Sequence, residues 1–456
     1  MSRKYFGTDG VRGVANTKLT PELAFRIGQA AGQTLATKRV VIGRDTRRSG
    51  PMLGAALGAG FCSVGVDVIA IGVVPTPAAS FAARTGGYGM GCVISASHNP
   101  APDNGIKLLG SDGGKVSDAQ ELEIERLMDT ELNDRVTGAG IGYLTSERTA
   151  VETYLSFLEK VVPERLDGMH IAVDCAHGAA YELGPEILKR LGATVTVTGN
   201  HPDGNNINDE CGATSPETVQ KLTVSSGAQV GVAFDGDADR AVFSDERGRL
   251  INGDRTIGIW SAHWQSQGQL DPAIVVGTVM SNGGFEHYLG TRGITLERAA
   301  VGDKYVADRI RATQSRIGGE QSGHIIFPHH GPTGDGLVTM LELLRAVKRE
   351  GRPVSSFYDD YANWPQLLVN VTVSEREGWA ERPSIKAALQ QADAKLAGHG
   401  RVNVRPSGTQ PMIRVMVEAD SYDLRDSVAD AILAAFAADL DGKVYSRVDL
   451  THALGD

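Results

Sequence analysis

The stretch from Val40 to Ile69, VVIGRDTRRSGPMLGAALGAGFCSVGVDVI, decides the fold class. It begins with a short apolar strand that ends at Gly43, passes through a polar turn into a helix after Pro51, and closes on a second apolar strand at 66–69. An apolar strand followed by a helix and another apolar strand is typical of a parallel sheet that is covered on both faces. The stretch therefore predicts a βαβ unit.

Two later segments repeat this order. One runs from Ile171 to Val197, with its helix around residues 186–190, and the other runs from Ile274 to Leu296. Strands that alternate with helices in this way form parallel sheets. The chain is therefore expected to contain three similar α/β domains with mostly parallel sheets.

The C-terminal part has a different pattern. Residues 367–373 alternate in part like a half-buried strand, and a helix is expected around 383–397. Strands at 401–404 and 412–418 and a helix over 427–437 complete it. This order predicts a smaller α+β domain with an antiparallel sheet.

Length and composition agree with a multidomain enzyme. The 456 residues are too many for one hydrophobic core. We expect domains at residues 1–150, 151–250, 251–365 and 366–456. The formal net charge of -10 argues against a nucleic-acid partner or an anionic membrane surface, which require a basic face.

The chain has no segment that suggests export or a membrane span. Its start, MSRKYFGTDG, lacks the apolar core of a signal peptide, and the apolar stretch 52–74 is interrupted by serine, glycine and aspartate. The four cysteines form no CxxC pair, which favours buried free thiols. A cytoplasmic protein is expected.

The motif Ser95-Ala96-Ser97-His98-Asn99-Pro100 directly follows the apolar run 92–94 and precedes Asp103-Asn104-Gly105-Ile106-Lys107. Open α/β sheets bind their ligands beyond the carboxyl ends of the strands. This position favours a functional site, although a plain serine turn would have the same composition.

The motif Asp235-Gly236-Asp237-Ala238-Asp239-Arg240 carries three carboxylates at alternate positions. They can converge on one hard cation, and only three leave room for a ligand oxygen, which favours magnesium. An EF-hand is the rival, because Glu246 is twelfth from Asp235, but Arg240 occupies the sixth position where glycine is needed. A solvated acidic turn is the other alternative.

Two further motifs are rich in polar groups. Gly318-Gly319-Glu320-Gln321-Ser322-Gly323-His324 suits the hydroxyls of a sugar, or is a polar loop with a hydrogen-bonded histidine. Arg405-Pro406-Ser407-Gly408-Thr409-Gln410-Pro411, with Arg414 beyond it, combines the donors of a phosphate clamp, or is a surface turn. The glycine loops 6–13 (FGTDGVRG) and 43–47 (GRDTR) show little by themselves.

In their order along the chain, FGTDGVRG, SASHNP, DGDADR, GEQSGH and RPSGTQP resemble the α-D-phosphohexomutase superfamily across essentially the whole sequence. The resemblance implies four domains around a central cleft, each with one motif facing it. It implies an isomerase that transfers phosphoryl groups through phosphorylated Ser97. FGTDG and Gln321 favour members that interconvert glucosamine 6-phosphate and glucosamine 1-phosphate through a bisphosphorylated sugar.

The resemblance also assigns roles to residues. One Mg²⁺ per chain would be held by Asp235, Asp237, Asp239 and an oxygen of phosphorylated Ser97, and a sugar bisphosphate would prime the enzyme. Lys107 and His324 match the general acid and base. The remaining expected contacts are Arg12 and Arg240 at the reacting phosphate, Glu320 and Ser322 at the sugar hydroxyls, and Arg405, Ser407, Gly408, Thr409 and Arg414 at the other phosphate.

Several alternatives remain at this point. A glucose or mannose phosphate mutase would share these catalytic residues, and a bisphosphate synthase, a phosphatase or a non-catalytic phosphosugar-binding protein could share the fold. Ala238 replaces a commoner glycine of the family, which is a small change if its φ is negative. Gln410 replaces glutamate and Pro406 is also less usual. The partner is expected to be a hexosamine phosphate, and the protein a monomer or a homodimer.

Overall fold

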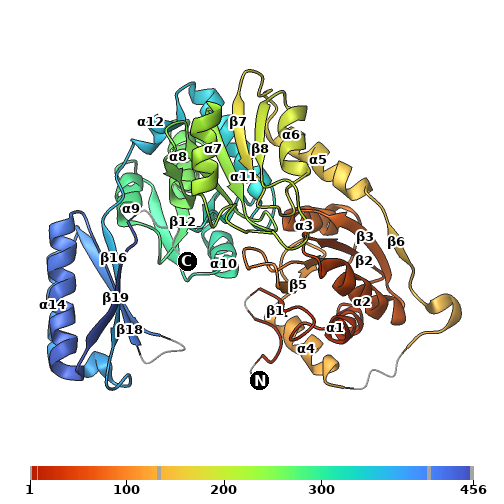
Figure 1. The fold of residues 1–456 in the computed structure, drawn as a ribbon, viewed down its shortest axis with the longest axis horizontal. Helices are drawn as coiled ribbons and strands as arrows, with labels where there is room; N and C mark the ends of the chain where they lie inside the picture. The colour runs from red at the N-terminus through yellow and green to blue at the C-terminus, as the bar shows by residue number, and fades with distance from the viewer. Residues whose placement is uncertain (1–2, 8, 131–134, 408–411, 452–456) are drawn as a thin grey trace. The chain divides into compact units, whose positions relative to one another are not determined.

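The computed structural model describes residues 3–7, 9–130, 135–407 and 412–451. The chain forms two compact units, of which unit 1 comprises residues 1–278 and 297–358, and unit 2 comprises residues 279–296 and 359–456. Figure 1 shows the fold and labels many of its helices and strands. The division into domains at residues 150, 250 and 365 stays a prediction.

The first sheet has six strands in the order β1-β5-β4-β2-β3-β6. The strands are β1 (Val11–Val14), β2 (Arg39–Arg44), β3 (Asp67–Val73), β4 (Met90–Ile94), β5 (Asp103–Gly110) and β6 (Leu144–Ser146). β5 runs antiparallel to both of its neighbours, whereas β4, β2, β3 and β6 are parallel. Every residue of β4 is buried, which explains its uninterrupted apolar sequence.

The second sheet has the order β11-β10-β9-β7-β8. Its strands are β7 (His170–Asp174), β8 (Thr194–Thr198), β9 (Val230–Phe234), β10 (Ala241–Asp245) and β11 (Leu250–Ile251). The third sheet, β13-β12-β14-β15, contains β12 (Ile274–Thr278), β13 (Thr295–Ala299), β14 (Gly318–Gly319) and β15 (Ile325–Ile326).

The helices of unit 1 cover these sheets (Figure 1). They are α1 (Pro21–Thr34), α2 (Gly50–Ser63), α3 (Thr76–Thr85), α4 (Asp118–Met128), α5 (Thr149–Val161), α6 (Leu183–Arg190), α7 (Glu217–Ser226), α8 (Gly253–Ser266), α10 (Asp303–Thr313), α11 (Gly336–Glu350) and α12 (Val354–Tyr358), with a 3₁₀ turn at Gly138–Gly140. Local sequence determines several of their ends. Ser117 and Gln120 form a capping box at α4, and Gly351 ends α11 in the left-handed conformation.

The first three sheets share one topology. Each follows the order strand, helix, strand, helix, strand, loop, strand: β2-α2-β3-α3-β4-β5, β7-α6-β8-α7-β9-β10 and β12-α9-β13-α10-β14-β15. In each sheet the last of these strands turns back antiparallel beside the one before it. This confirms three similar α/β domains, but the sheets are more mixed than the sequence suggested. The returning strand matters because each of these hairpin loops carries one of the three motifs.

Unit 2 contains the fourth sheet, β17-β18-β16-β19, in which every pair is antiparallel. Its elements are α9 (Gly283–Gly290), β16 (Gln366–Thr372), α13 (Pro383–Leu396), β17 (Gly400–Pro406), β18 (Met412–Ala419), α14 (Tyr422–Leu440) and β19 (Lys443–Asp449), with a 3₁₀ turn at Trp379–Glu381. Figure 1 shows α14 lying along the sheet. Alternate residues such as Val369, Val371 and Val415 pack against Ile432 and Phe436 of this helix in one core. The α+β tail is thus confirmed.

A buried carboxylate joins the two chain segments of unit 2. Glu418 on β18 is fully buried and accepts hydrogen bonds from the backbone N–H of Gly283 at 2.9 Å and from Arg401 Nε at 2.9 Å. Asn282 Nδ2 also donates to it, at 3.2 Å. Because a buried charge must be compensated, these donors attach α9 to the sheet. Among the described residues, no helix has the length and apolar composition that crossing a membrane requires.

Candidate active site

The serine motif forms the hairpin loop between β4 and β5. Ser97 is 2% exposed, and its Oγ donates a hydrogen bond of 2.5 Å to Asp235 Oδ2. Its φ is 51°, in the left-handed region that residues other than glycine rarely adopt. Such a conformation persists only where the surroundings impose it, which is common at functional sites.

The acidic motif forms the corresponding loop between β9 and β10. Asp235 and Asp237 are fully buried, Asp239 is 7% exposed, and carboxylate oxygens of the three lie within 4.8 Å of one another. Oδ1 of Asp237 and Oδ1 of Asp239 are buried without a hydrogen-bond partner in the described part of the chain. Burial and the charges of Asp239 and Asp237 raise the pKa of Asp235 well above its usual range.

These observations fit a cation. Buried carboxylates that repel one another require a positive charge nearby. Their oxygens without a hydrogen-bond partner can serve as ligands of a cation. Burial excludes the solvated acidic turn, and the flanking strands β9 and β10 exclude an EF-hand, which needs helices there. The three aspartates form a potential metal site.

Lys107 lies on β5 beside these carboxylates and is 3% exposed. Its Nζ is 2.8 Å from Asp237 Oδ2, 3.0 Å from Asp9 Oδ2 and 3.6 Å from Asp239 Oδ2. Burial lowers the pKa of Lys107, but Asp237, Asp9 and Asp239 raise it, and the net result lies well above its ordinary value. A buried ammonium group therefore lies beside the acidic loop and Asp9.

Asp9 connects this centre to a second lysine. It pairs with Arg12, whose Nη1 also donates to the carbonyl of Ala96 at 3.4 Å. Lys115 Nζ lies 2.7 Å from Asp9 Oδ1 and 2.6 Å from Asp303 Oδ2, at the first residue of α10. This chain of charges links the first sheet to the third.

The sugar-binding motif forms the loop between β14 and β15 and reaches the second sheet. Arg240 and His324 form an isolated β-bridge, and Ala241 N donates to the carbonyl of Gly323 at 3.1 Å. His324 is 3% exposed, and neither ring nitrogen has a hydrogen-bond partner among the residues that the structure describes. Its side chain also lines a cavity of about 510 Å³, together with Lys115, Ser117, Asp303 and Thr333. The imidazole is therefore available to a ligand.

Glu320 and Ser322 precede His324 in the same loop. Both are nearly buried, at 9% and 8% exposed. Glu320 Oε1 accepts a hydrogen bond of 2.9 Å from the backbone N–H of Gly302. Unit 1 thus places these two residues in one loop with His324. It also brings Ser97 and Lys107 to the acidic loop, whereas Arg12 contacts Asp9 and the serine loop.

The phosphate-binding motif lies in unit 2. Arg405 on β17 is paired across the sheet with Arg414 on β18. Ser407 Oγ and Arg414 Nε are buried and have no hydrogen-bond partner within the described residues. These unpaired donors fit a bound anion. Gly408 and Thr409, together with Gln410, lie outside the described residues.

Some residues of this region were not predicted. Thr76, at the start of α3, donates from Oγ1 to Asp237 Oδ2 at 2.6 Å. Asp9 stood within the motif FGTDGVRG but had no assigned role, whereas Thr76, Lys115 and Asp303 belong to no motif that the sequence analysis recognised. Their positions depend on contacts between distant segments, which a local pattern does not reveal.

Ala238 stands where the family more often has glycine, and its φ is +55°. The replacement of glycine by alanine would be a small change at negative φ, so it is not a small change here. A left-handed residue with a side chain costs about 1–2 kcal/mol. Gly336 N donates to the carbonyl of Ala238 at 3.0 Å and helps to fix this conformation.

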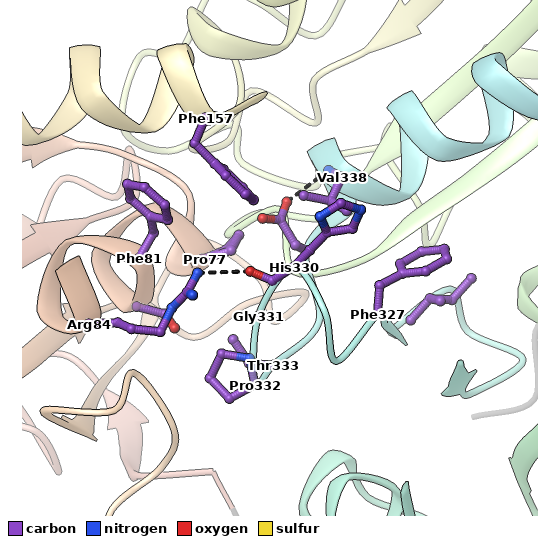
Figure 2. Close-up of a pocket in the computed structure, with 13 residues that line it drawn as sticks. Pro77, Phe81, Arg84, Phe157, Phe327, His330, Gly331, Pro332, Thr333 and Val338 are labelled. Carbon is purple, nitrogen blue, oxygen red and sulfur yellow. Dashed lines mark hydrogen bonds between the residues drawn. The ribbon is translucent and has the colours of Figure 1, made fainter. Parts of the chain in front are cut away.

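Two other features of unit 1 lie outside the predicted site. Figure 2 shows a pocket bordered by Phe81, Phe157 and His330, in which Arg84 Nη2 donates to the carbonyl of His330 at 2.8 Å. None of the predicted site residues that the structure describes lines it. His330 Nε2 also lies 2.6 Å from Glu342 Oε1, and Arg345 Nη1 lies 3.5 Å from Glu342 Oε2. The charge of the buried Glu342 is thus compensated by Arg345.

Comparisons with known proteins identify the family. Models of the phosphoglucomutase/phosphomannomutase family match in sequence order: alpha/beta/alpha domain I at residues 3–135, domain II at 152–248, domain III at 252–364 and the C-terminal domain at 368–435.

Relatives over nearly the full length carry one name. The phosphoglucosamine mutase of Desulforamulus reducens is 47% identical over 433 residues, which cover 94% of this chain and 98% of the relative. The phosphoglucosamine mutase of Methylobacterium radiotolerans is 46% identical, with 95% of this chain and 99% of the relative covered.

Solved structures agree in fold. A phosphoglucomutase/phosphomannomutase family protein from Burkholderia thailandensis superposes with a TM-score of 0.78 at 26% identity and covers 95% of this chain and 97% of its own. An N-acetylphosphoglucosamine mutase from Aspergillus fumigatus, solved with GlcNAc-6P and magnesium, has a TM-score of 0.65 at 20% identity, with 95% of this chain and 96% of its own covered. The chain belongs to the phosphohexomutase superfamily and, within it, to the phosphoglucosamine mutases, which are isomerases acting on hexose phosphates.

Proposed function

We propose that this chain interconverts glucosamine 6-phosphate and glucosamine 1-phosphate with Ser97 as the phosphoryl carrier. The observation that carries this assignment is the 2.5 Å contact between Ser97 Oγ and Asp235 Oδ2, within a buried group of three carboxylates and Lys107. The names of the relatives support the substrate.

The reaction begins with phosphorylated Ser97. A sugar hydroxyl attacks the phosphorus, the bond to Ser97 Oγ breaks, and a sugar bisphosphate forms. The bisphosphate turns over and returns its other phosphoryl group to Ser97, which releases the isomer. The transition state of such transfers is loose, so the protein mainly positions the groups and compensates charge.

Lys107 and His324 are the candidates for proton transfer. A general base must lie within hydrogen-bond reach of the attacking hydroxyl. Lys107 lies beside the acidic loop as an ammonium group whose raised pKa suits a proton donor, and the ring nitrogens of His324 are unpartnered among the described residues. Both are buried, so they are shielded from competing water.

Asp235, Asp237 and Asp239, with an oxygen of phosphorylated Ser97, would hold one Mg²⁺. When bound, the ion supplies a positive charge that stabilises the serine oxygen as it leaves. Their unpaired Oδ1 atoms on Asp237 and Asp239 support this assignment.

The remaining residues bind the substrate. Arg12 and Arg240 are assigned to the reacting phosphate, and Glu320 and Ser322 to the sugar hydroxyls. The other phosphate is assigned to a phosphate clamp in unit 2, made up of Arg405, Ser407, Gly408, Thr409 and Arg414. A sugar bisphosphate would first phosphorylate Ser97 and so prime the enzyme.

We further propose a cytoplasmic location, because Cys62, Cys92, Cys175 and Cys211 are all free and three of them are buried. The partner is a small hexosamine phosphate, with no nucleic acid or membrane involved. The working form is proposed to be a monomer or a homodimer.

The test compares turnover of glucosamine, glucose and mannose 6-phosphates in the presence of magnesium and a priming bisphosphate. We expect a clear preference for glucosamine 6-phosphate. A preference for glucose or mannose phosphate would keep the mechanism and overturn the substrate. No turnover of any of the three substrates would favour a non-catalytic phosphosugar-binding protein.

The carrier role is tested by Ser97→Ala. The variant should fold as the native protein does, shown by circular dichroism, and should lose turnover. It should also fail to gain the mass of one phosphoryl group when incubated with the bisphosphate. Appreciable remaining mutase activity would contradict the role of Ser97.

A further inference from the structure

The GRDTR segment at the end of β2 lies directly beneath the Ser97 loop. Arg47 is fully buried, and all five of its side-chain N–H groups are used within unit 1. The acceptors are Asp45 Oδ2 at 2.9 Å and the carbonyls of Ser97 at 2.9 Å, Asn99 at 2.7 Å, Pro100 at 2.5 Å and Asp103 at 3.0 Å.

Three of these acceptors, the carbonyls of Ser97, Asn99 and Pro100, lie in the hairpin loop that carries the nucleophile, and the fourth carbonyl, that of Asp103, belongs to the first residue of β5. Backbone carbonyls of one loop rarely converge on a single point, because their dipoles repel one another. The planar guanidinium offers a rigid fork of donors that can hold them together. It therefore holds the loop at Ser97, at Asn99 and Pro100, and at the point where the chain enters β5.

Ser97 needs such support because its φ of 51° is strained. Its carbonyl accepts a second hydrogen bond of 2.9 Å from Asn208 Nδ2, which comes from the segment between β8 and α7. Asn208 Nδ2 also lies 3.2 Å from the carbonyl of Asn99. The strained residue is thus held from two sides.

The charge of Arg47 is compensated inside the same cluster. Asp45 is fully buried, pairs with Arg47, and accepts a hydrogen bond of 2.5 Å from Ser95 Oγ. Ser95 Oγ in turn accepts one of 2.9 Å from the backbone N–H of Ser97. Arg47, Asp45 and Ser95 thereby form a closed circuit around the backbone of Ser97.

Arg47 differs from the arginines that are assigned to phosphate, because its N–H groups are all used in this circuit. Arg12 retains a buried Nε with no hydrogen-bond partner among the described residues. Arg47 has no donor left, so it cannot bind a phosphate without releasing the loop. Its effect on the reaction must pass through Ser97.

We infer that Arg47, together with Asp45, is a positioning residue that holds Ser97 in the left-handed conformation which directs Oγ to Asp235. The inference rests on the proposed role of Ser97 as carrier. Phosphoryl transfer depends on alignment, and a misplacement of about 1 Å can reduce the rate on the order of 100-fold.

Arg47→Lys keeps the charge but removes the fork. We expect kcat to fall about 10- to 100-fold while KM for the hexosamine phosphate changes less than about twofold. The phosphoserine should give one sharp ³¹P resonance in the native enzyme, and a shifted or split one in the variant.

Loss of a buried guanidinium destabilises a protein wherever it lies, so a matched control is needed. Arg255→Lys provides it: Arg255 is 3% exposed on α8, donates from Nη1 to the carbonyl of Tyr358 at 2.7 Å, and lies over the Tyr358 ring. This control should lower the melting temperature without changing kcat or the ³¹P resonance.

A second variant protects the test against misfolding. Asn208→Ala removes the other donor to the Ser97 carbonyl and should reduce kcat in the same way, but less. The inference is overturned if Arg47→Lys and Asn208→Ala retain the kcat and the ³¹P resonance of Arg255→Lys. If the native enzyme takes up no phosphate on Ser97, the carrier role fails instead, which intact-mass measurement distinguishes.

Discussion

At the scale of single residues, the predicted site contains several buried polar atoms that lack hydrogen-bond partners in the described part of the chain, as do atoms elsewhere such as Trp260 Nε1. Folded proteins pair nearly all such atoms, so each exception needs an explanation, and a bound ligand is one. Among the described residues, the atoms of the predicted site include Asp237 Oδ1, Asp239 Oδ1, Arg12 Nε and both ring nitrogens of His324. Each of these residues belongs to a motif that the sequence analysis singled out, and their roles in catalysis stay predictions.

Asp239 offers the cleanest test of metal binding. Its free Oδ1 is available to an ion, whereas its Oδ2 lies 3.6 Å from Lys107, farther than the 2.8 Å contact of Asp237. Asp239→Asn should therefore weaken Mg²⁺ binding about 10-fold or more while leaving the Lys107–Asp237 pair in place. Calorimetric titration with Mg²⁺ measures the change directly.

The matched control is Asp254→Asn, which neutralises another buried aspartate, at the start of α8. Its Mg²⁺ affinity should equal that of the native protein. Unchanged affinity in Asp239→Asn would remove that residue from the ligand set.

At the scale of elements, the sequence shows where strands and helices lie but not which strands run antiparallel to their neighbours. β2, β7 and β12 are recognisable as apolar runs, and so the three α/β units were predicted. β14 and β15 have two residues each, too few for any periodicity, and the antiparallel returns of β5 and β10 depend on pairing. The hairpins that carry the motifs therefore emerge only from the structure.

Contacts between elements escaped prediction for the same physical reason. Arg47 lies within GRDTR, yet its proposed role depends on four carbonyls of the Ser97 loop and the start of β5, some fifty residues away. Thr76 and Lys115 belong to no recognised motif. A side chain that acts through a distant partner leaves no mark on its own neighbourhood in the sequence.

The bridge between Asp9, Lys115 and Asp303 gives a prediction about acid stability. Burial raises the pKa of Asp303, but Lys115 and His324 lower it to a net value below normal, and the pKa of Asp9 is likewise lowered, against burial, by Lys107, Lys115 and Arg12. A carboxyl group whose pKa is lowered by folding stabilises the folded state at pH values above its ordinary pKa, near 4. This stabilisation is lost as the pH falls through the pKa that the group has in the folded protein.

Lys115→Met removes one of these positive charges and leaves the burial. The pKa of Asp9 and of Asp303 should rise, so the midpoint of acid unfolding should move upward by about 0.5 pH unit. Lys304→Met is the control, because its partner Asp118 is more than half exposed and such surface pairs contribute little. An equal shift in both variants would refute a special contribution of the buried bridge.

At the scale of the whole molecule, the proposed roles are divided between the two units. Unit 1 holds Ser97, the three aspartates and both candidates for proton transfer, whereas the residues proposed to clamp a phosphate belong to unit 2. Unit 2 has its own core and its own buried carboxylate, Glu418, which joins its two chain segments. Such a division suits a reaction in which one phosphate reacts while the other serves only as a handle.

This division predicts that changes in unit 2 affect binding and leave transfer intact. Arg414→Gln removes a guanidinium whose Nε is buried and unpartnered among the described residues. A charge-assisted contact to phosphate of this kind contributes about 1.5–3 kcal/mol. KM should therefore rise about 10- to 100-fold, whereas kcat at saturating substrate and the affinity for Mg²⁺ should stay close to native values.

Arg447→Gln is the matched control in the same sheet, because Arg447 on β19 is 40% exposed and pairs with Asp430, which is 63% exposed. Its KM should not change. If Arg414→Gln instead lowered kcat and left KM unaltered, Arg414 would act in the transfer step and the division would fail. A loss of Mg²⁺ affinity in the same variant would show that unit 2 contributes to the metal site. The combination of a raised KM with a native kcat is expected only if unit 2 holds the phosphate that does not react.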